Sequence, residues 1–211
     1  MIIAVDGPAA SGKGTIARRL AKHYGLPHLD TGLLYRAVGI GVLRADGDPS
    51  SPEDALAACA FGDAVLMDPA LKSEAAGKAA SLVSPHPAVR AALFERQVAF
   101  AAQAGGAVLD GRDIGTVIAP HAPSKLFITA SPEVRAERRW RELSNMGLGV
   151  EIAHVLTDIR ARDERDSARS AAPLRMADDA HLLDTSALGI EEAFAAALAL
   201  VRIAYPLHAN D

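Results

Sequence analysis

The chain opens with "MIIAVDGPAASGKGTIARRL" (residues 1–20), and this stretch decides the fold. The apolar run of residues 2–6 predicts a buried strand, and residues 13–24 predict a helix because Ile16 and Leu20 recur at helical spacing. The segment between them is built of small residues, whose uncovered backbone N–H groups can point at a ligand rich in oxygen. A strand, a G-x-x-x-x-G-K loop and a helix in this order are typical of a phosphate-binding loop, or P-loop.

The loop is expected to hold the phosphates of a nucleotide. Its backbone amides surround the phosphates, and Lys13 reaches the transferred phosphate as a point charge. Gly14 stands where the common form has Ser or Thr, and this G-K-G-T variant resembles the loop of nucleoside monophosphate kinases. We therefore expect Thr15 to contact phosphate and Mg²⁺ to rest largely on phosphate oxygens and water, with no residue assigned as a metal ligand. The predicted nucleotide-binding residues are Gly7, Pro8, Ala9, Ala10, Ser11, Gly12, Lys13, Gly14 and Thr15.

Strand-like runs that alternate with helices predict an α/β fold. Three further β-rich runs end in turns, at 107–113, 125–133 and 180–186, and the last precedes a closing helix over 190–204. We expect a central parallel sheet of about five strands with helices on both faces, the three-layer fold of P-loop proteins. In such sheets ligands bind beyond the carboxyl ends of the strands.

Composition narrows the class of protein. With 211 residues, half of them hydrophobic and 4% aromatic, the chain suits one helix-rich globular unit. The net charge of −4 gives no basic field for nucleic acid or an anionic membrane surface. Cys59 is the single cysteine, the seven histidines show no metal spacing, and the N-terminus lacks the basic region of a signal peptide. We expect a cytoplasmic monomer that binds neither nucleic acid nor membrane.

The motif "LDTGLLYR" (29–36) is predicted to bind an anion. It begins a helix, whose first turn offers backbone amides and the Thr31 hydroxyl, and Arg36 follows about one turn later. Taken alone, Thr31 is better explained as a plain helix cap. We interpret Tyr35 as a core residue.

The motif "DGRDIGT" (110–116) places two carboxylates and an arginine directly after a predicted strand. We interpret Asp110 as an acid near the metal in the manner of a Walker-B residue, Arg112 as an anion clamp and Asp113 as a hydrogen-bond acceptor. The alternative is an arginine held only by its flanking acids. The position beside a P-loop favours the functional interpretation.

The segment "EIAHVLTDIRARDERDSARS" (151–170) predicts a charged helix that ends near Pro173. Its apolar stripe continues, at helical spacing, into a face formed by Arg162, Asp166 and Arg169. A solvated helix supported by i,i+4 ion pairs is the ordinary interpretation of such a run. A packed face that turns cationic also suits a lid over phosphates, and one such arginine contributes roughly 10³–10⁵ in rate in phosphoryl transfer.

Taken together, six segments in order resemble the bacterial cytidylate kinases, a family of P-loop nucleoside monophosphate kinases. They are "DGPAASGKGT" (6–15), "LDTGLLYR" (29–36), "KAAS" (78–81), "AVRAAL" (88–93), "DGRDIGTV" (110–117) and "RARDERDSARSAAPL" (160–174). The resemblance implies a phosphotransferase that converts ATP and CMP or dCMP into ADP and CDP or dCDP, with Mg²⁺.

The resemblance also implies roles for residues. Ser81, Arg90 and Asp113 match the positions that read cytosine, which offers an amine donor to a carboxylate and acceptors to arginine and hydroxyl. The remaining matches are Arg36 and Arg112 on the acceptor phosphate, Arg162 and Asp166 on the sugar, Arg169 on the phosphates when the lid closes, and Thr31 where the family often has Ser. Lys13, Arg112, Arg162 and Arg169 are the predicted catalytic residues.

The family architecture divides the chain into three parts. The expected core is about 1–36, 104–143 and 176–211, with a nucleoside-monophosphate-binding insert at about 37–103 and a lid at about 144–175. The extra β-rich piece that many members carry in the insert is reduced here to about "GDAVLMDPALKSE" (62–74).

Other functions stay open at this point. The P-loop and lid are equally compatible with a kinase that acts on UMP or AMP, although the base-reading set favours cytosine. A P-loop switch protein would need a guanine-reading N-K-x-D motif, which the sequence lacks, and would not need an arginine-rich lid. A nucleotide-dependent assembly factor would need partner surfaces that a sequence does not reveal.

Overall fold

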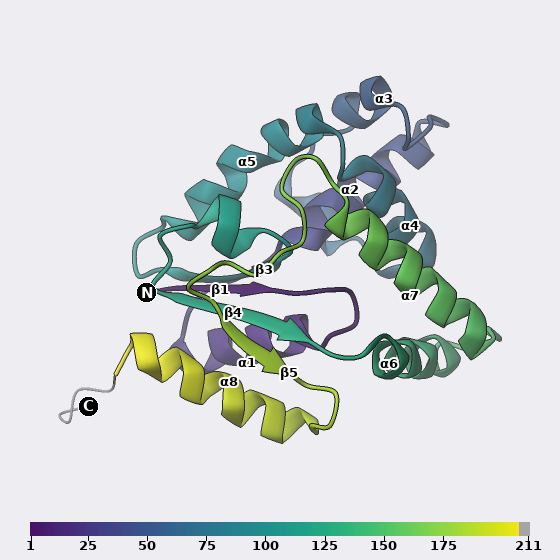
Figure 1. The fold of residues 1–211 in the computed structure, drawn as a ribbon. Helices are drawn as coiled ribbons and strands as arrows, with labels where there is room; N and C mark the ends of the chain where they lie inside the picture. Colours follow the sequence, from purple (N-terminus) through teal and green to yellow (C-terminus); the bar gives the residue numbers. More distant parts are fainter. Residues whose placement is uncertain (207–211) are drawn as a thin grey trace.

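A five-stranded, all-parallel sheet forms the centre of the protein, in the order β2-β3-β1-β4-β5 (Figure 1). The computed structural model describes residues 1–206, so residues 207–211 of the predicted core, including His208, lie outside the described residues. The strands are β1 (Ile2–Asp6), β2 (His28–Asp30), β3 (Ala107–Gly111), β4 (Ser124–Thr129) and β5 (His181–Asp184). The predicted α/β fold with about five parallel strands is confirmed.

Eight α-helices and three short helices connect and cover the strands of the described chain. The α-helices are α1 (Lys13–Tyr24), α2 (Thr31–Arg44), α3 (Pro52–Ala57), α4 (Glu74–Val83), α5 (Pro87–Ala101), α6 (Pro132–Asn145), α7 (Ile152–Ser167) and α8 (Ile190–Ala204). Two 3₁₀ helices, η1 (Asp63–Met67) and η2 (Pro69–Lys72), and a π-helix, η3 (Ile114–Ile118), complete the set. None of the helices in residues 1–206 has the length and apolar character needed to cross a membrane.

The two faces of the sheet bury separate cores because side chains alternate along each strand. On β1, Ile3 and Val5 pack with residues of α1 and α8, whereas Ala4 packs with residues of α5 and η3. Figure 1 shows the same layers, with α1 and α8 on one side of the sheet and α2 to α5 on the other. The helix bounds of α1 and α8 agree with those that periodicity predicts.

Two segments differ from the expected local structure. Strand β2 could not be predicted from the sequence, because three residues are too few to show a period. The charged helix was expected to end near Pro173, and this was wrong: α7 ends at Ser167, and Arg169 lies outside it. The chain reverses there, since the Leu174 N–H donates to the Asp166 carbonyl oxygen at 2.8 Å.

The P-loop backbone has positive φ angles at three positions, two of which are glycines. Gly7, Ala10 and Gly12 have φ angles of 151°, 59° and 88°, in the region that residues with side chains rarely adopt. At Gly7 a Cβ atom would lie 1.9 Å from the carbonyl oxygen of Ile128, because the loop leaves β1 in contact with β4. Gly7 is therefore required by close packing as well as by its φ angle.

Replacing Gly7 tests this close contact. We expect Gly7→Ala to reduce the free energy of unfolding by about 3 kcal/mol or more, since the added methyl group must displace the β4 backbone. Gly25→Ala is the matched control: Gly25 also has a positive φ, 62°, but a Cβ there meets nothing within 4 Å, and its cost should be only ~1 kcal/mol. Urea unfolding measures both, and equal losses would contradict the packing argument.

Candidate active site

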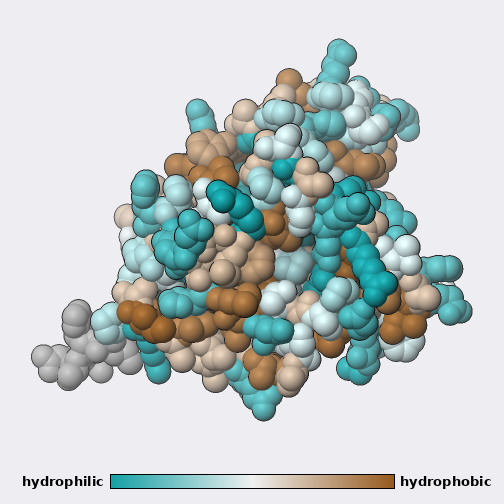
Figure 2. Space-filling view, in the orientation of Figure 1, coloured by the Kyte–Doolittle hydropathy of each residue, from teal (hydrophilic) through white to brown (hydrophobic). Residues whose placement is uncertain are grey.

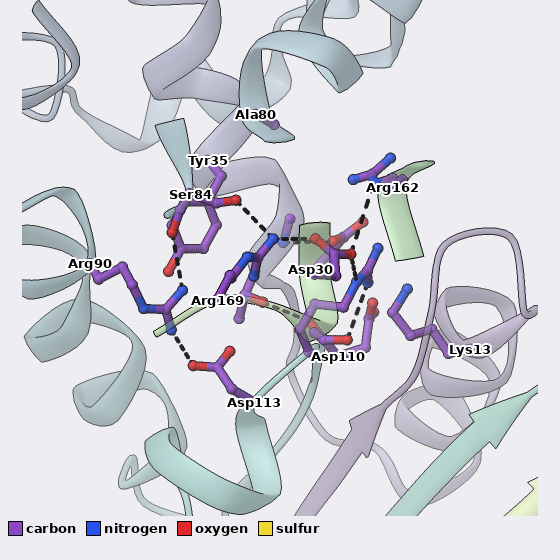
Figure 3. Close-up of a pocket in the computed structure, with 15 residues that line it drawn as sticks. Lys13, Asp30, Tyr35, Ala80, Ser84, Arg90, Asp110, Asp113, Arg162 and Arg169 are labelled. Carbon is purple, nitrogen blue, oxygen red and sulfur yellow. Dashed lines mark hydrogen bonds and ion pairs between the residues drawn. The ribbon is translucent and has the colours of Figure 1, made fainter. Parts of the chain in front are cut away.

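A pocket of about 60 Å³ lies where the P-loop helix, the carboxyl ends of β2 and β3, and helices α4, α5 and α7 meet (Figure 3). In Figure 3 Lys13 stands at one side of this pocket, and Arg90 and Asp113 stand at the other. Eight predicted site residues line it: Lys13, Thr31, Arg90, Arg112, Asp113, Arg162, Asp166 and Arg169. Residues far apart in the sequence therefore converge as expected.

At the P-loop side the polar groups fit phosphate. The backbone N–H groups of residues 9 to 14 donate to no acceptor within residues 1–206, and the Ser11 hydroxyl is buried there without a partner. The Lys13 ammonium donates to the Pro8 carbonyl oxygen at 3.4 Å. Burial, with a smaller contribution from the nearby Arg112 cation, lowers the pKa of Lys13 to about 8. An anion at this point would accept from the free amides and shift the pKa of Lys13 back toward its ordinary value.

Two arginines of α6 brace the back of the P-loop. Arg135 donates to the Ala9 carbonyl oxygen at 3.4 Å and forms a two-pronged ion pair with Asp163 of α7, at 2.9 and 2.6 Å. Arg138 donates to the Ser11 carbonyl oxygen at 3.4 Å and to the Thr185 carbonyl oxygen at 2.7 Å. The loop conformation is thus held by α6, and α6 is tied to α7.

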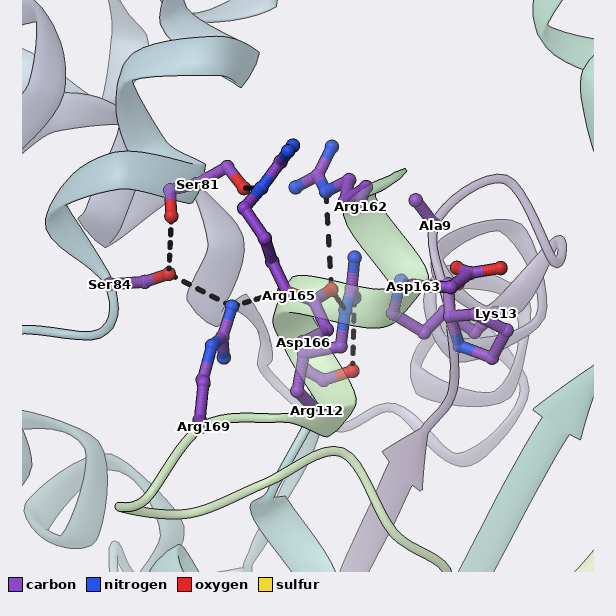
Figure 4. A network of polar contacts seen from close by, with 12 residues as sticks. Ala9, Lys13, Ser81, Ser84, Arg112, Arg162, Asp163, Arg165, Asp166 and Arg169 are labelled. Carbon is purple, nitrogen blue, oxygen red and sulfur yellow. Dashed lines mark hydrogen bonds and ion pairs between the residues drawn. The ribbon is translucent and has the colours of Figure 1, made fainter. Parts of the chain in front are cut away.

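Between the two sides of the pocket, one carboxylate lies among three arginines (Figure 4). Asp166 is 1% exposed; it accepts from the Arg112 Nε at 2.8 Å and from Arg169, and the Arg162 Nε lies 4.0 Å away. Burial works to raise the pKa of Asp166, but the three guanidiniums together hold it below its ordinary value. Burial, with repulsion from Arg112, lowers the pKa of Arg162 to about 10.

The arginines outnumber the acid, and part of their hydrogen-bonding capacity is unused. The Nε atoms of Arg162 and Arg169 are buried and have no partner among residues 1–206. Figure 2 shows hydrophilic residues gathered along α7, the helix that carries Arg162. A buried excess of cations with free donors is the chemistry of a site for a polyanion, which suits phosphates.

The far side of the pocket is built around another ion pair. Arg90 donates to the Asp113 carboxylate, and its guanidinium lies over the Tyr35 ring at 5.8 Å from the centroid. Burial raises the pKa of Asp113, although the Arg90 cation opposes this. The Ser84 hydroxyl accepts from Arg169 at 2.9 Å, and the Ser84 carbonyl oxygen accepts from Arg90 at 3.4 Å. Planar and polar groups together suit the edge of a nucleobase.

Three predicted substrate residues are engaged with the protein itself. Arg36 donates to the carbonyl oxygens of Leu71, at 2.7 Å, and Ser73, at 3.3 Å, outside the pocket lining. Ser81 also lies outside the lining, and its hydroxyl accepts from the Arg165 Nε at 3.2 Å. Thr31 lines the pocket, but its hydroxyl donates to the Asp110 carbonyl oxygen at 2.9 Å. Of the P-loop residues, only Lys13 reaches this pocket.

Several residues at the site carry no motif that identifies them in the sequence. Asp30, the N-cap of α2, lines the pocket, and its side chain accepts from the Gly32 N–H at 3.0 Å. His28 contacts Asp110, with 2.7 Å between Nε2 and Oδ2. Short strands and isolated histidines carry no motif, although Asp30 does stand at the helix start that the sequence predicts. Ser84 likewise follows Ser81 by one helical turn.

The two strand-end carboxylates bear on the question of a metal. Asp30 and Asp110 line the same pocket as Lys13, and burial together with the Asp110 charge raises the pKa of Asp30. Among residues 1–206 no group of three or more His, Cys, Asp or Glu side chains could hold a metal ion. Mg²⁺ in nucleotide-binding proteins keeps several waters and is held by one or two carboxylates together with substrate phosphates. Asp30 and Asp110 are compatible with such a site.

The chain is similar to known proteins along nearly its whole length. A model of the family described as Cytidylate kinase matches residues 3–203. The cytidylate kinase of Xanthobacter autotrophicus (strain ATCC BAA-1158 / Py2) is 65% identical over 202 residues, covering 95% of this chain and 97% of the relative. The cytidylate kinase of Methylobacterium sp. (strain 4-46) is 61% identical over 207 residues, covering 98% of this chain and 99% of the relative.

A solved structure shares the fold. The crystal structure of an uncharacterized protein from Eubacterium ventriosum ATCC 27560 aligns over 98% of this chain and 99% of its own, with a TM-score of 0.56 and 16% identity. At this identity the likeness concerns the fold alone.

Neutralising Asp166 tests the balance of charge in the pocket. We expect Asp166→Asn to reduce the free energy of unfolding by about 3 kcal/mol, because it leaves buried arginines without their carboxylate. Added sulfate should restore part of the loss by occupying the cationic cluster of the folded state. Glu191→Gln, which breaks the exposed pair with Arg19, is the control and should cause no comparable loss. Thermal unfolding with and without sulfate measures this, and a variant that sulfate does not stabilise would contradict it.

Proposed function

The chain belongs to the cytidylate kinase family, and on that premise we propose that it transfers the terminal phosphate of ATP to CMP and dCMP, forming CDP and dCDP. The observation that carries this proposal, beside the family match, is the continuous pocket from Lys13 to the Arg90–Asp113 pair. The side with Lys13 would bind the phosphates of ATP, and the side with Arg90 and Asp113 would bind the base of CMP. A single chain supplies both sides, which supports an active monomer.

The donor side would hold ATP by its phosphates. The free amides of residues 9 to 14 and the Lys13 ammonium supply donors at the place where the P-loop meets α1. Mg²⁺ would be held by the phosphates together with Asp30 and Asp110, and when bound it offsets negative charge on the phosphates. Thr15 would contact phosphate from the first turn of α1.

The acceptor side would hold CMP in two parts. We propose that Arg112 and Arg36 bind its phosphate, although Arg36 must then leave the carbonyl oxygens of Leu71, on η2, and Ser73, directly after η2. Asp113 would accept from the exocyclic amine of cytosine, while Arg90 and Ser81 would donate to the ring acceptors. Asp166 and Arg162 would contact the sugar. Thr31 would contribute to the substrate site from the start of α2, the helix that also carries Arg36.

The chemical step needs charge stabilisation and exclusion of water more than a general base. Arg112, Arg162 and Arg169 would surround the transferred phosphoryl group, and they are already gathered around Asp166. The pocket of about 60 Å³ is far below the ~300–1,000 Å³ of ordinary ligand sites. We propose that residues 144–175 act as a lid that opens for nucleotides and returns its arginines onto their phosphates.

The same transfer to UMP is the second candidate. Asp113 disfavours it, because uracil presents an acceptor oxygen where cytosine presents an amine, and a carboxylate would then face that oxygen. The reduced segment 62–74 forms η1 and η2 and supplies no residue to the pocket lining. Discrimination would therefore depend on the Arg90–Asp113 pair and its neighbours.

A panel of acceptors tests the proposed function. With ATP and Mg²⁺, we expect ADP to form with CMP and dCMP, much more slowly with UMP, and negligibly with AMP, GMP or no acceptor. Lys13→Ala should abolish turnover with every acceptor while still binding CMP, because its charge acts on the transferred phosphate. Coupled-enzyme assay and calorimetry measure these. ADP formed at the same rate without an acceptor would show a nucleotide hydrolase or switch instead.

Replacing Asp113 tests base reading. We expect Asp113→Asn to lower the CMP/UMP ratio of kcat/KM by about tenfold or more, since the amide can pair with either base, and to leave KM for ATP nearly unchanged. Steady-state kinetics with both acceptors measures the ratio. An unchanged ratio would remove Asp113 from base recognition.

A further inference from the structure

Asp6, the last residue of β1, is a buried acid that the proposed chemistry does not use. Its side chain is 5% exposed, and its two carboxylate oxygens accept from the backbone N–H groups of Ile114, at 2.8 Å, and Gly115, at 2.7 Å. Both amides belong to the first turn of η3, across the sheet edge from β1. Each oxygen therefore has one donor of its own.

The two amides follow directly after the residues that would meet CMP. Arg112 and Asp113 form the turn between β3 and η3, and Ile114 and Gly115 end it. The turn has little freedom at this point: a Cβ on Gly115 would lie 3.4 Å from the Asp6 Oδ2 and 3.2 Å from the Lys125 Cδ. Fixing the two amides thus fixes where the Asp113 side chain stands.

Asp6 also adjoins the P-loop, because Gly7 is the next residue. In the sheet Asp6 is in register with Gly111 of β3, so β1 and β3 end together. A single side chain consequently joins the start of the donor loop to the turn that carries the acceptor residues. No other side chain in residues 1–206 hydrogen-bonds to the amides of Ile114 and Gly115.

The carboxylate is a costly way to make this connection. Burial raises the pKa of Asp6 to about 7, even though the two amide donors act to lower it. A buried carboxylate that is partly destabilised by its surroundings is poorly explained by stability alone, since a neutral side chain would avoid the desolvation. What only a carboxylate of this size supplies is two acceptor oxygens for two adjacent N–H groups.

We propose that Asp6 is a positioning residue, which holds Arg112 and Asp113 in register with the P-loop and thereby sets the affinity and selectivity for the acceptor nucleotide. The proposal rests on the proposed function of this site. It assigns Asp6 no contact with either nucleotide.

Asp6→Asn is the direct test, because the amide keeps the shape of the side chain but offers one acceptor oxygen and turns an NH₂ group toward the second N–H. We expect KM for CMP to rise by about tenfold and the CMP/UMP ratio of kcat/KM to fall several-fold, as for the loss of a hydrogen bond to a charged group. KM for ATP should stay within about twofold, and the melting temperature should not fall. If Asp6→Asn does not fold, Asp6→Ser, which keeps one small acceptor, replaces it and should show the same changes in KM and selectivity.

Val201→Ala is the control for a merely structural effect. Val201 is fully buried in the core between α8 and the sheet, so this variant should lose stability without changing the KM for CMP or the selectivity. An Asp6→Asn enzyme with unchanged KM and selectivity, or one whose KM for ATP rises equally, would overturn the proposal. If wild type prefers another acceptor, the proposed function fails, and the Asp6 effect is then measured on that acceptor.

Amide exchange gives a readout that does not depend on turnover. In the wild type the N–H groups of Ile114 and Gly115 should exchange as slowly as those in the middle of β1, and in Asp6→Asn they should exchange at least about tenfold faster. The amides within α8 should be unaffected. Fast exchange at Ile114 and Gly115 in the wild type would overturn the proposal even if no Asp6 variant folds.

Discussion

The carboxylate of Asp166 lies buried among the guanidiniums of Arg112, Arg162 and Arg169, and this imbalance of charge governs the site. One anion holds three cations that come from the turn after β3, from α7 and from the segment beyond it. Cations that are buried close together repel one another, and a nearby anion offsets this repulsion. We therefore expect the cluster to prefer phosphate, which brings more negative charge and more acceptor oxygens than one carboxylate.

The parallel sheet determines where the site residues lie. All strands are parallel, so their carboxyl ends meet at one edge, and β1 and β3 there lead into the P-loop and into the turn of Arg112 and Asp113. Under the proposed function, the donor and acceptor phosphates would reach the same few residues from opposite sides. Helices α2 and α5 add the Tyr35 and Arg90 side chains at the far end, where a base would lie.

The fold and most of the residues that line the pocket could be predicted from local sequence patterns. The P-loop could be predicted because its glycines, its lysine and its flanking strand and helix all lie within residues 1–24. Helical spacing also predicted that Arg162 and Asp166 lie on one face of α7, but Arg169, which was assigned to the same face, lies beyond the end of this helix. The partners of these residues could not be predicted. The contacts of Asp166 with Arg112, of Ser81 with Arg165 and of Arg36 with the Leu71 carbonyl oxygen join segments that are distant in sequence. The same holds for His28 with Asp110, since neither stands in a motif with the other.

The central claim is that the arginines held by Asp166 are exchanged onto substrate phosphates. A crystal structure with CMP and a non-hydrolysable ATP analogue tests it most directly. We expect the terminal phosphate of the analogue to lie within hydrogen-bonding distance of Lys13, the CMP phosphate to contact Arg112, and Arg162 or Arg169 to bridge toward them. If both phosphates lay away from these arginines, with the Asp166 contacts unchanged, the cluster would be a structural ion-pair network and the claim would be contradicted.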